Sequence, residues 1–379
     1  MRKLIILLPL IAIFVYPVKL SAQDFTIQVD TLRDYRLHLP TNYSSEKSYP
    51  LLFALHGGFG TSERMEEETN FSDKADQEGF IVVYPQAIGT TRSWNTGSCC
   101  GWAFNNDVDD ILFFETLIDE LSSNYSVDIN RVYATGFSSG AMMSYALACK
   151  LSDKIAAIAP VASSMIIDVC EPNCTAVPIL HLHAAPDESA LFYGGYSDNP
   201  LLQFYYPPVD SVMRAWAMKK NCNTTIDSTI MSNGTKVYKW SDCEQNNYQE
   251  MWLADDGGHK WPGTSGVSPL SRDRATQDFD ATEVVWDFLS QFQKECITSA
   301  LENQIENVEI QIYPNPVLEY LNVSNITNQT IINIYDIHGK QVLNNLRTNR
   351  IFVGNLNRGL YFLSVRNSKN MISFKFVKE

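Results

Sequence analysis

Short apolar runs that alternate with helical patterns constrain the fold of this 379-residue chain more than any other feature. The runs are continuous, as expected for parallel strands that are buried on both faces of a sheet. They span 51–55, 80–84, 132–134, 155–161, 179–182 and 250–254. Stretches with apolar residues at helical spacing span 108–125, 209–220 and 276–294. The alternation predicts an α/β fold, with a mostly parallel sheet and helices on both of its faces.

A hairpin is expected before these runs. Apolar and polar residues alternate over 25–29 and again over 35–39, with a polar turn between them. This period of two predicts a pair of antiparallel strands at the start of the sheet. The sheet is therefore expected to be mixed and to contain about eight strands.

The pattern changes after residue 298. Residues 299–307 are polar and lack strand alternation, which predicts a linker. Short apolar stretches separated by turn residues then fill 308–379, at 308–313, 320–323, 331–335, 350–353, 360–365 and 372–377. They predict a small all-β sandwich that follows an α/β domain over 23–298.

The first 22 residues are typical of an export signal. Arg2 and Lys3 precede an apolar run over 4–15, and the small residues Ser21 and Ala22 close the segment. The run is too short for a bilayer, which needs about 20 residues. Residues 1–22 are therefore predicted to be a secretory signal peptide, with a buried N-terminal helix as the alternative. No later segment is apolar enough for a transmembrane helix to be expected.

Eight cysteines lie between the two ends of the chain. An even number of cysteines in an exported chain favours disulfides over metal ligation. The pairs suggested by proximity in the sequence are Cys170–Cys174 and Cys222–Cys243. Cys99 or Cys100 would then need a distant partner, such as Cys149.

Charge and motifs exclude several kinds of ligand. The net charge of −14 argues against a nucleic-acid partner, because an acidic chain without a basic stripe repels phosphate. The glycine-rich stretch at 56–60 lacks the residues of a P-loop and the spacing of a dinucleotide-binding turn. The sequence also lacks an H-E-x-x-H motif and a spaced cluster of cysteines and histidines. No metal and no cofactor are therefore expected.

Ser138 stands in a G-x-S-x-G motif, flanked by Gly136 and Gly140, between a predicted strand and a predicted helix. In this context the serine occupies a strained turn, where a β-carbon on either glycine would clash with the neighbouring strand and helix. The helix that follows points a backbone N–H at the anion that forms on attack. Ser138 is therefore the candidate nucleophile, and a glycine-serine turn without chemistry is the alternative.

A serine nucleophile needs a base, and the base needs an acid that orients it. His259 lies on a glycine-rich loop after the run 250–254, where an α/β hydrolase places its base; a solvated loop histidine is the alternative. The acid is expected between the serine and the histidine, at the end of the preceding strand. Asp187 is the first choice, Glu188 and Asp168 are the alternatives, and a structural N-cap is another role for Asp187.

Several ordered motifs resemble those of a known family. They are Trp94 to Trp102, Asp107 to Asp110, the nucleophile segment through Cys149, and Gly258 to Gly263. Over residues 25–295 the chain resembles the poly(3-hydroxybutyrate) depolymerase and feruloyl esterase group of α/β hydrolases. The family usually has His-Gly-Thr before the acid, whereas this chain has His183, Ala184, Ala185, Pro186 and Asp187. This departure borders the expected substrate site.

The resemblance implies an α/β-hydrolase fold and specific site residues. Ser138, Asp187 and His259 would form the catalytic triad. The backbone amides of Gly58 and Ser139 would form the oxyanion hole. The resemblance further implies that two carboxylates cap the start of a helix; they are those of Asp109 and Asp110.

The tail resembles a second family. Tyr313 to Pro316, Ile334 to Asp336 and Gly359 to Tyr361 are similar to motifs of the C-terminal sorting domain of the type IX secretion pathway of Bacteroidota. The similarity covers 305–379 and implies the type IX machinery as a partner and an extracellular or cell-surface location. A carbohydrate-binding module is the alternative.

These features together predict a secreted serine carboxylic-ester hydrolase that acts on a polymeric or small ester. The substrate would be a polyester of the polyhydroxybutyrate kind, or feruloyl or acetyl esters of polysaccharide. A serine peptidase on the same fold and a non-catalytic surface binding protein on a decayed hydrolase scaffold are the alternatives. Trp94, Trp102 and Trp261 flank the site in the sequence and would stack on a substrate, although packing explains them equally well.

Overall fold

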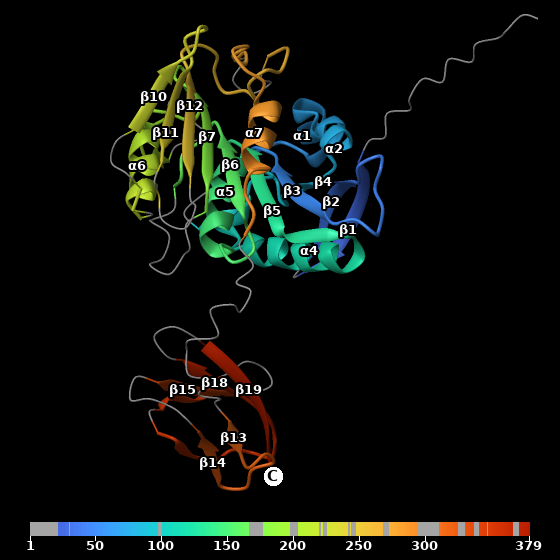
Figure 1. Cartoon of the computed structure of the whole chain (residues 1–379), viewed down its shortest axis with the longest axis vertical. Coiled ribbons are helices and arrows are strands. Elements are labelled where there is room, and N and C mark those ends of the chain that lie inside the picture. The colour runs from blue at the N-terminus through green and yellow to red at the C-terminus, as the bar shows by residue number, and fades with distance from the viewer. Residues whose placement is uncertain are drawn as a thin grey trace, which may run out of the picture. The chain divides into compact units, whose positions relative to one another are not determined.

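Figure 1 shows the computed structural model of the whole chain. The structure describes residues 22–29, 31–97, 101–166, 177–197, 204–219, 221–222, 226–241, 243, 248–267, 273–294, 311–324, 330–336, 341–346, 348–366 and 371–379. The predicted signal peptide up to residue 21, the predicted linker, Asp168 and five of the cysteines (Cys99, Cys100, Cys170, Cys174 and Cys296) lie outside these residues.

The chain divides into two compact units, residues 1–296 and residues 297–379. The first unit is built on a ten-stranded sheet with the order β1-β2-β4-β3-β5-β6-β7-β12-β11-β10. The strands are β1 (Gln23–Gln28), β2 (Leu32–His38), β3 (Tyr49–Leu55), β4 (Ile81–Pro85), β5 (Val127–Phe137), β6 (Ala157–Val161), β7 (Ile179–Ala184), β10 (Ile226–Ile230), β11 (Lys236–Trp240) and β12 (Gln249–Ala254). The strands from β4 to β12 in this order are parallel, and antiparallel strands flank them on both sides. The predicted mixed, mostly parallel sheet is confirmed.

The sheet has two strands more than the sequence predicts, β10 and β11. The side chains of β10 are mostly exposed, so this edge strand carries no continuous apolar run. Residues 231–235 connect it to β11 and include Asn233 and Gly234, a pair that favours a hairpin turn. The turn between β10 and β11 is therefore the sequence feature that indicates this hairpin.

Helices cover both faces of the sheet, as Figure 1 shows. Leu51, Phe53 and Leu55 of β3 pack toward one face, and Leu52 and Ala54 pack toward the other, because side chains alternate along a strand. The first face is covered by α4 (Asp110–Asn124), α5 (Ser139–Lys150) and α6 (Val209–Lys219). The second is covered by α1 (Ser62–Thr69), α2 (Phe71–Glu78) and α7 (Ala281–Leu289). A short helix, α3 (Gly101–Asn105), precedes α4.

The start of α4 corrects one expectation. Asp109 is the N-cap, and its Oδ1 accepts a hydrogen bond from Leu112 N at 2.9 Å. Asp110 has a different role, because its Oδ1 lies 2.5 Å from Arg33 Nη2 and its Oδ2 accepts the Asn95 N–H. Arg33 and Asp110 are both buried. Asp110 therefore joins α4 to β2 through an ion pair instead of capping the helix.

One predicted disulfide is confirmed. Cys222 and Cys243 are bonded to each other and join the end of α6 to the segment after β11. Cys149 is also disulfide-bonded, to a partner outside the described residues.

The second unit is an all-β sandwich, as predicted. One of its sheets has the order β13-β14-β17 and the other has the order β16-β15-β18-β19. The strands are β13 (Ile312–Tyr313), β14 (Tyr320–Val323), β15 (Ile331–Asp336), β16 (Gln341–Leu346), β17 (Arg350–Phe352), β18 (Gly359–Arg366) and β19 (Met371–Lys378). Apolar residues of both sheets form its core, among them Leu321, Ile332, Ile351 and Leu363. β16 was not predicted from the sequence.

Candidate active site

Ser138 occupies the tight turn between β5 and α5. Its φ of 56° and ψ of −118° lie outside the helical and strand regions. A β-carbon on Gly136 would come within 2.4 Å of the backbone of Gly140, and one on Gly140 would come within 2.3 Å of the Leu55 carbonyl oxygen. Both positions need glycine because the start of α5 packs directly against β3 and β5. The turn presents the Ser138 side chain at the carboxyl edge of the sheet.

Three parallel strands bring the predicted Ser138, His259 and Asp187 together. Ser138 follows β5, Asp187 follows β7 and His259 follows β12, so all three lie at the same edge. His259 Nε2 is 2.9 Å from Ser138 Oγ, and His259 Nδ1 is 2.8 Å from Asp187 Oδ2. The three side chains form one hydrogen-bonded series, and Asp187 rather than Glu188 supplies its carboxylate.

Asp187 is held as a buried carboxylate. Its Oδ1 accepts hydrogen bonds from the backbone N–H groups of Ser189 and Ala190, both at 2.8 Å. Burial acts to raise the pKa of Asp187, but the charge and hydrogen bond of His259, followed by His183 and the Ala190 N–H, more than offset it, so the pKa lies below the usual value. An ionised carboxylate in this place orients His259 and stabilises the imidazolium.

The loop after β3 crosses over the nucleophile. A β-carbon on Gly57 would lie 3.1 Å from Ser138 Cβ, and one on Gly58 would lie 3.9 Å from Ser139 Oγ. Within the described part of the chain, no group accepts a hydrogen bond from the backbone N–H of Gly58 or of Ser139. Both amides therefore remain available for the oxyanion hole that was predicted from them.

His56 and Trp94 hold this loop in place. His56 Nε2 accepts the Ala87 N–H at 3.1 Å, so its Nδ1 carries the hydrogen and donates to the Gly57 carbonyl at 2.7 Å. Burial lowers the pKa of His56 to about 4, which keeps the ring neutral. Trp94 Nε1 donates to the His56 carbonyl at 3.0 Å. Because Trp94 is 0% exposed, the predicted substrate contact is wrong for this residue, which supports the loop instead.

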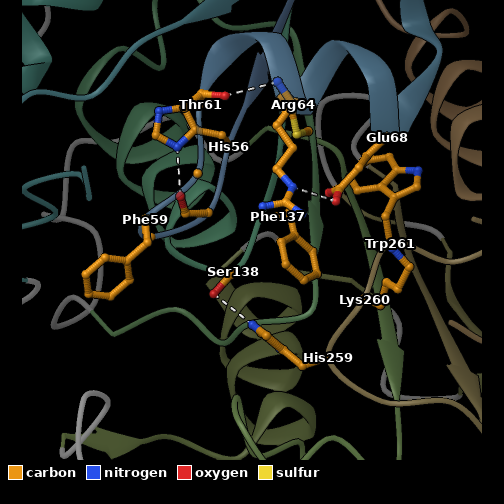
Figure 2. Close-up of a pocket in the computed structure, with 14 residues that line it drawn as sticks. His56, Phe59, Thr61, Arg64, Glu68, Phe137, Ser138, His259, Lys260 and Trp261 are labelled. Atoms are coloured by element: carbon orange, nitrogen blue, oxygen red, sulfur yellow. Dashed lines mark hydrogen bonds and ion pairs between the residues drawn. The ribbon is translucent and has the colours of Figure 1, made fainter. Parts of the chain in front are cut away.

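A pocket of about 160 Å³ opens beside Ser138, as Figure 2 shows. Its walls are formed by the loop 56–61, by α1, by the Phe137 ring and by the segment 259–261. The Phe137 ring lies 4.7 Å from the His259 ring. The lining is apolar in large part, as is typical of pockets that bind small molecules.

Helix α1 contributes residues to the pocket that the sequence analysis did not single out. Arg64, Met65 and Glu68 line the pocket, and Arg64 Nε lies 3.1 Å from a carboxylate oxygen of Glu68. The available signal was Thr61, whose side chain caps α1 directly after the glycine-rich bend. A helix that begins there has to lie beside the loop 56–60, which carries Gly58 and is called the oxyanion loop.

The other two tryptophans differ in position. Trp261 lines the pocket but is only 2% exposed, and its indole packs against Phe71 and donates to Thr282 Oγ1. Trp102 is not among the residues that line this pocket; its ring packs so closely on Gly89 that a β-carbon there would come within 2.2 Å. Contacts within the protein therefore involve much of the surface of both tryptophan side chains.

Among the described residues, no group of three or more His, Cys, Asp or Glu side chains is arranged to hold a metal ion. No helix in the described part of the chain is long and apolar enough to cross a membrane.

The fold and the series Ser138, His259 and Asp187 have the arrangement of an α/β hydrolase. Residues 33–196 match the family described as esterase PHB depolymerase. The chain is 32% identical over 256 residues to a probable feruloyl esterase C of Aspergillus oryzae, a match that covers 66% of the chain and 84% of the relative. The chain belongs to the PHB depolymerase and feruloyl esterase group, which confirms the resemblance.

Two further relatives are larger proteins. The chain is 28% identical over 285 residues to a bifunctional acetylxylan esterase/xylanase of Neocallimastix patriciarum, and 28% identical over 231 residues to feruloyl esterase B of Piromyces equi. The matches cover 75% and 58% of the chain. The chain spans only 37% and 41% of the lengths of these two relatives.

The second unit matches a different family. Residues 311–379 match the secretion system C-terminal sorting domain. The predicted type IX sorting domain is confirmed, and with it the extracellular or cell-surface location.

Proposed function

We propose that the chain is a secreted serine carboxylic-ester hydrolase that works through an acyl-enzyme. The observation that carries the proposal is the continuous series from Ser138 Oγ through the His259 ring to Asp187, with contacts of 2.9 and 2.8 Å. A serine hydroxyl is a weak nucleophile unless a base takes its proton, and an imidazole oriented by a carboxylate is such a base.

In the proposed reaction, Ser138 Oγ attacks the ester carbonyl while its proton moves to His259 Nε2. The amides of Gly58 and Ser139 donate hydrogen bonds to the oxyanion of the tetrahedral intermediate. The C–O bond to the alcohol then breaks, and His259 gives its proton to the leaving oxygen. Water, deprotonated by the same ring, attacks the acyl-enzyme; the bond between the acyl carbon and Ser138 Oγ breaks, Oγ takes back the proton from His259, and the acid is released.

The proposed substrates are feruloyl or acetyl esters of polysaccharide, with hydroxyalkanoate polyesters as the alternative. Relatives named acetylxylan esterase and feruloyl esterase support the first class. The pocket is consistent with it, because Phe59, Met65 and Phe137 offer apolar contacts to an acyl group next to Ser138.

Labelling by a fluorophosphonate together with turnover of short nitrophenyl esters tests the activity. The expected result is stoichiometric labelling of the parent protein and none of Ser138→Ala, with a loss of kcat of at least about 10³-fold in the variant. A matched control is Ser144→Ala, because Ser144 lies on α5 with its hydroxyl bonded to the Gly140 carbonyl, away from His259. Equal labelling of the parent and Ser138→Ala, or no labelling of either, would indicate a scaffold without catalysis.

A substrate panel then separates the classes. Feruloyl esters, acetylated xylan, hydroxybutyrate oligomers and a peptide anilide would be compared at equal concentrations of labelled site. The proposal expects turnover of the polysaccharide esters and none of the anilide. Faster turnover of the anilide than of every ester would contradict the proposed esterase activity and indicate a peptidase.

A further inference from the structure

A buried series of polar side chains lies behind Asp187 and is not used in the proposed reaction. It begins at Tyr145 on α5 and passes through His181 and His183 of β7. Tyr145, His181 and His183 are at most 1% exposed. Polar groups at this depth have to be hydrogen-bonded, and each bond here is short enough to count.

The distances along the series are well defined. Tyr145 Oη is 2.8 Å from His181 Nδ1, and His181 Nε2 is 3.0 Å from His183 Nδ1. His183 Nε2 is 2.7 Å from the Ala190 carbonyl oxygen and 3.6 Å from Asp187 Oδ2. The His183 ring at the end of the series therefore lies next to both the Asp187 carboxylate and the Ala190 carbonyl of the loop 187–190.

Burial favours the neutral form of both imidazoles. Burial lowers the pKa of His181 well below its usual value, with His183 adding to the effect. Burial also lowers the pKa of His183, although Asp187 and the Ala190 carbonyl act in the opposite direction. A neutral imidazole has one nitrogen that donates and one that accepts.

The end of the series fixes the direction of every hydrogen bond in it. The Ala190 carbonyl can only accept, so His183 Nε2 has to carry the hydrogen. His183 Nδ1 is then an acceptor, which requires the hydrogen of His181 to be on Nε2. His181 Nδ1 in turn accepts from the Tyr145 hydroxyl. All three hydrogens point toward the acid loop.

We propose that His183 is a positioning residue for Asp187, and that Tyr145 and His181 hold it in the required tautomer. The His183 N–H fixes the Ala190 carbonyl, while the Ala190 and Ser189 amides fix Asp187 Oδ1, so the loop 187–190 is tied at both its ends. His183 Nε2 also lies 3.6 Å from Oδ2, the oxygen that faces His259. The consequence for hydrolysis rests on the proposed function; the tautomer does not.

Ring ¹⁵N NMR of the parent protein tests the tautomer without any substrate. The chain has six histidines, and the resonances of two are assigned by their loss in His181→Gln and His183→Gln. Both rings are expected to be neutral with the hydrogen on Nε2. A hydrogen on Nδ1 of either ring, or a doubly protonated ring at pH 7, would overturn the proposal even if the protein proves to be a good esterase.

Kinetics test the positioning role, with rates expressed per site labelled by fluorophosphonate. His183→Leu removes the N–H and is expected to lower kcat about 10- to 100-fold with KM within about twofold, because a small displacement of a catalytic group has that effect. His183→Gln keeps a donor near the Ala190 carbonyl and should recover most of the loss. His38→Leu is the control, since His38 is also buried and bonded to an aspartate, Asp76, but lies on β2.

The outcomes are distinguishable. A purely structural role predicts that His183→Leu lowers the unfolding temperature, as His38→Leu would, while kcat per labelled site stays at the parent value; that result would overturn the positioning role. If the His183 variants do not fold, the NMR result on the parent decides. If the parent hydrolyses no ester but shows both Nε2–H tautomers, the proposed function fails and the assignment of the hydrogen bonds stands.

Discussion

Gly140 lies with its α-carbon against the carbonyl oxygen of Leu55, so that a β-carbon on residue 140 would come within 2.3 Å of that oxygen. Backbone on backbone leaves nothing flexible to move aside. This contact joins the start of α5 to the end of β3 and so places Ser138 beside the oxyanion loop.

Gly140→Ala is therefore expected to lower the free energy of unfolding by about 3 kcal/mol or more, the upper end of what overpacking costs. The control is Gly79→Ala, which changes a glycine with a φ of 77° and no neighbour within 4 Å of the added carbon. Its cost should be only about 1–2 kcal/mol, from the left-handed backbone alone. Urea denaturation measures both, and equal losses would contradict the steric explanation.

Asp187→Asn is expected to lower kcat roughly 10³- to 10⁴-fold, because an amide cannot stabilise the imidazolium and favours the wrong tautomer of the base. Glu188→Gln is the matched control, since the adjacent carboxylate makes no contact with His259 among the described residues. It should keep the parent rate on a nitrophenyl ester. A comparable loss of kcat in Glu188→Gln would show that Asp187 is not the specific acid of the site.

Arg33→Met is expected to cost about 3–5 kcal/mol of unfolding free energy, because it leaves the buried Asp110 carboxylate without its cation. Burial already raises the pKa of Asp110, with Arg33 opposing that effect. Without Arg33 the carboxyl avoids its charge by keeping a proton, so the loss should be larger at pH 8 than at pH 5.

The control for this variant is Arg214→Met, which breaks the exposed contact of 4.0 Å with Asp210. Exposed pairs contribute about 0–1 kcal/mol, so this change should be nearly neutral. Chemical denaturation at the two pH values checks both predictions. A loss for Arg33→Met that is small, or that shrinks as the pH rises, would show that the buried pair does not work as described.

The pKa of Asp76 is the basis of a prediction about acid stability. Burial acts to raise this pKa, but hydrogen bonds from His38 and Thr41 more than offset it and lower it below the usual value. A carboxyl whose pKa is lower in the folded state stabilises the fold above its unfolded pKa of about 3.9, and this contribution is lost as the pH falls through the folded pKa.

The difference in unfolding free energy between the parent and Asp76→Asn should accordingly shrink as the pH falls below about 5. Asp287→Asn is the control, because Asp287 is exposed and its carboxylate has no partner among the described residues. Denaturation curves recorded between pH 2.5 and 7, at intervals of about half a pH unit, would check this. A difference that grows toward low pH would contradict the sign.

The local sequence pattern was enough to predict the parallel strands of the sheet and the position of Ser138, His259 and Asp187 at one edge of it. Each of these residues follows an apolar strand at a point marked by glycine or by a break in the pattern, so its place at the sheet edge could be inferred from its own neighbourhood. The edge strand β10 and its neighbour β11 carry no such run, and only the turn at Asn233 and Gly234 marks them.

Two contacts between distant residues could not be predicted from these patterns. Asp110 looked like a second cap because it stands next to Asp109, yet its partner is Arg33, 77 residues away. Trp94 looked like a surface for substrate because it is aromatic and lies near a motif, yet it is fully buried under the oxyanion loop. The burial of a single aromatic side chain in a loop and the partner of a single charged one both depend on how distant elements pack, so neither could be inferred from the neighbouring residues.

The hydrogen-bonded series at the sheet edge has one more consequence. Ser138 and His259 are 121 residues apart along the chain, and His259 and Asp187 are 72 apart. They meet only because β5, β6, β7 and β12 lie next to one another in the sheet. Such non-local pairings form late and slowly during folding. No fragment of the chain, and no partly folded form that lacks one of these four strands, can bring the three groups into contact. On the proposed function, the chain would therefore hydrolyse esters only once the sheet is complete, and a chain that crossed a membrane unfolded would leave the esters of its own cell intact.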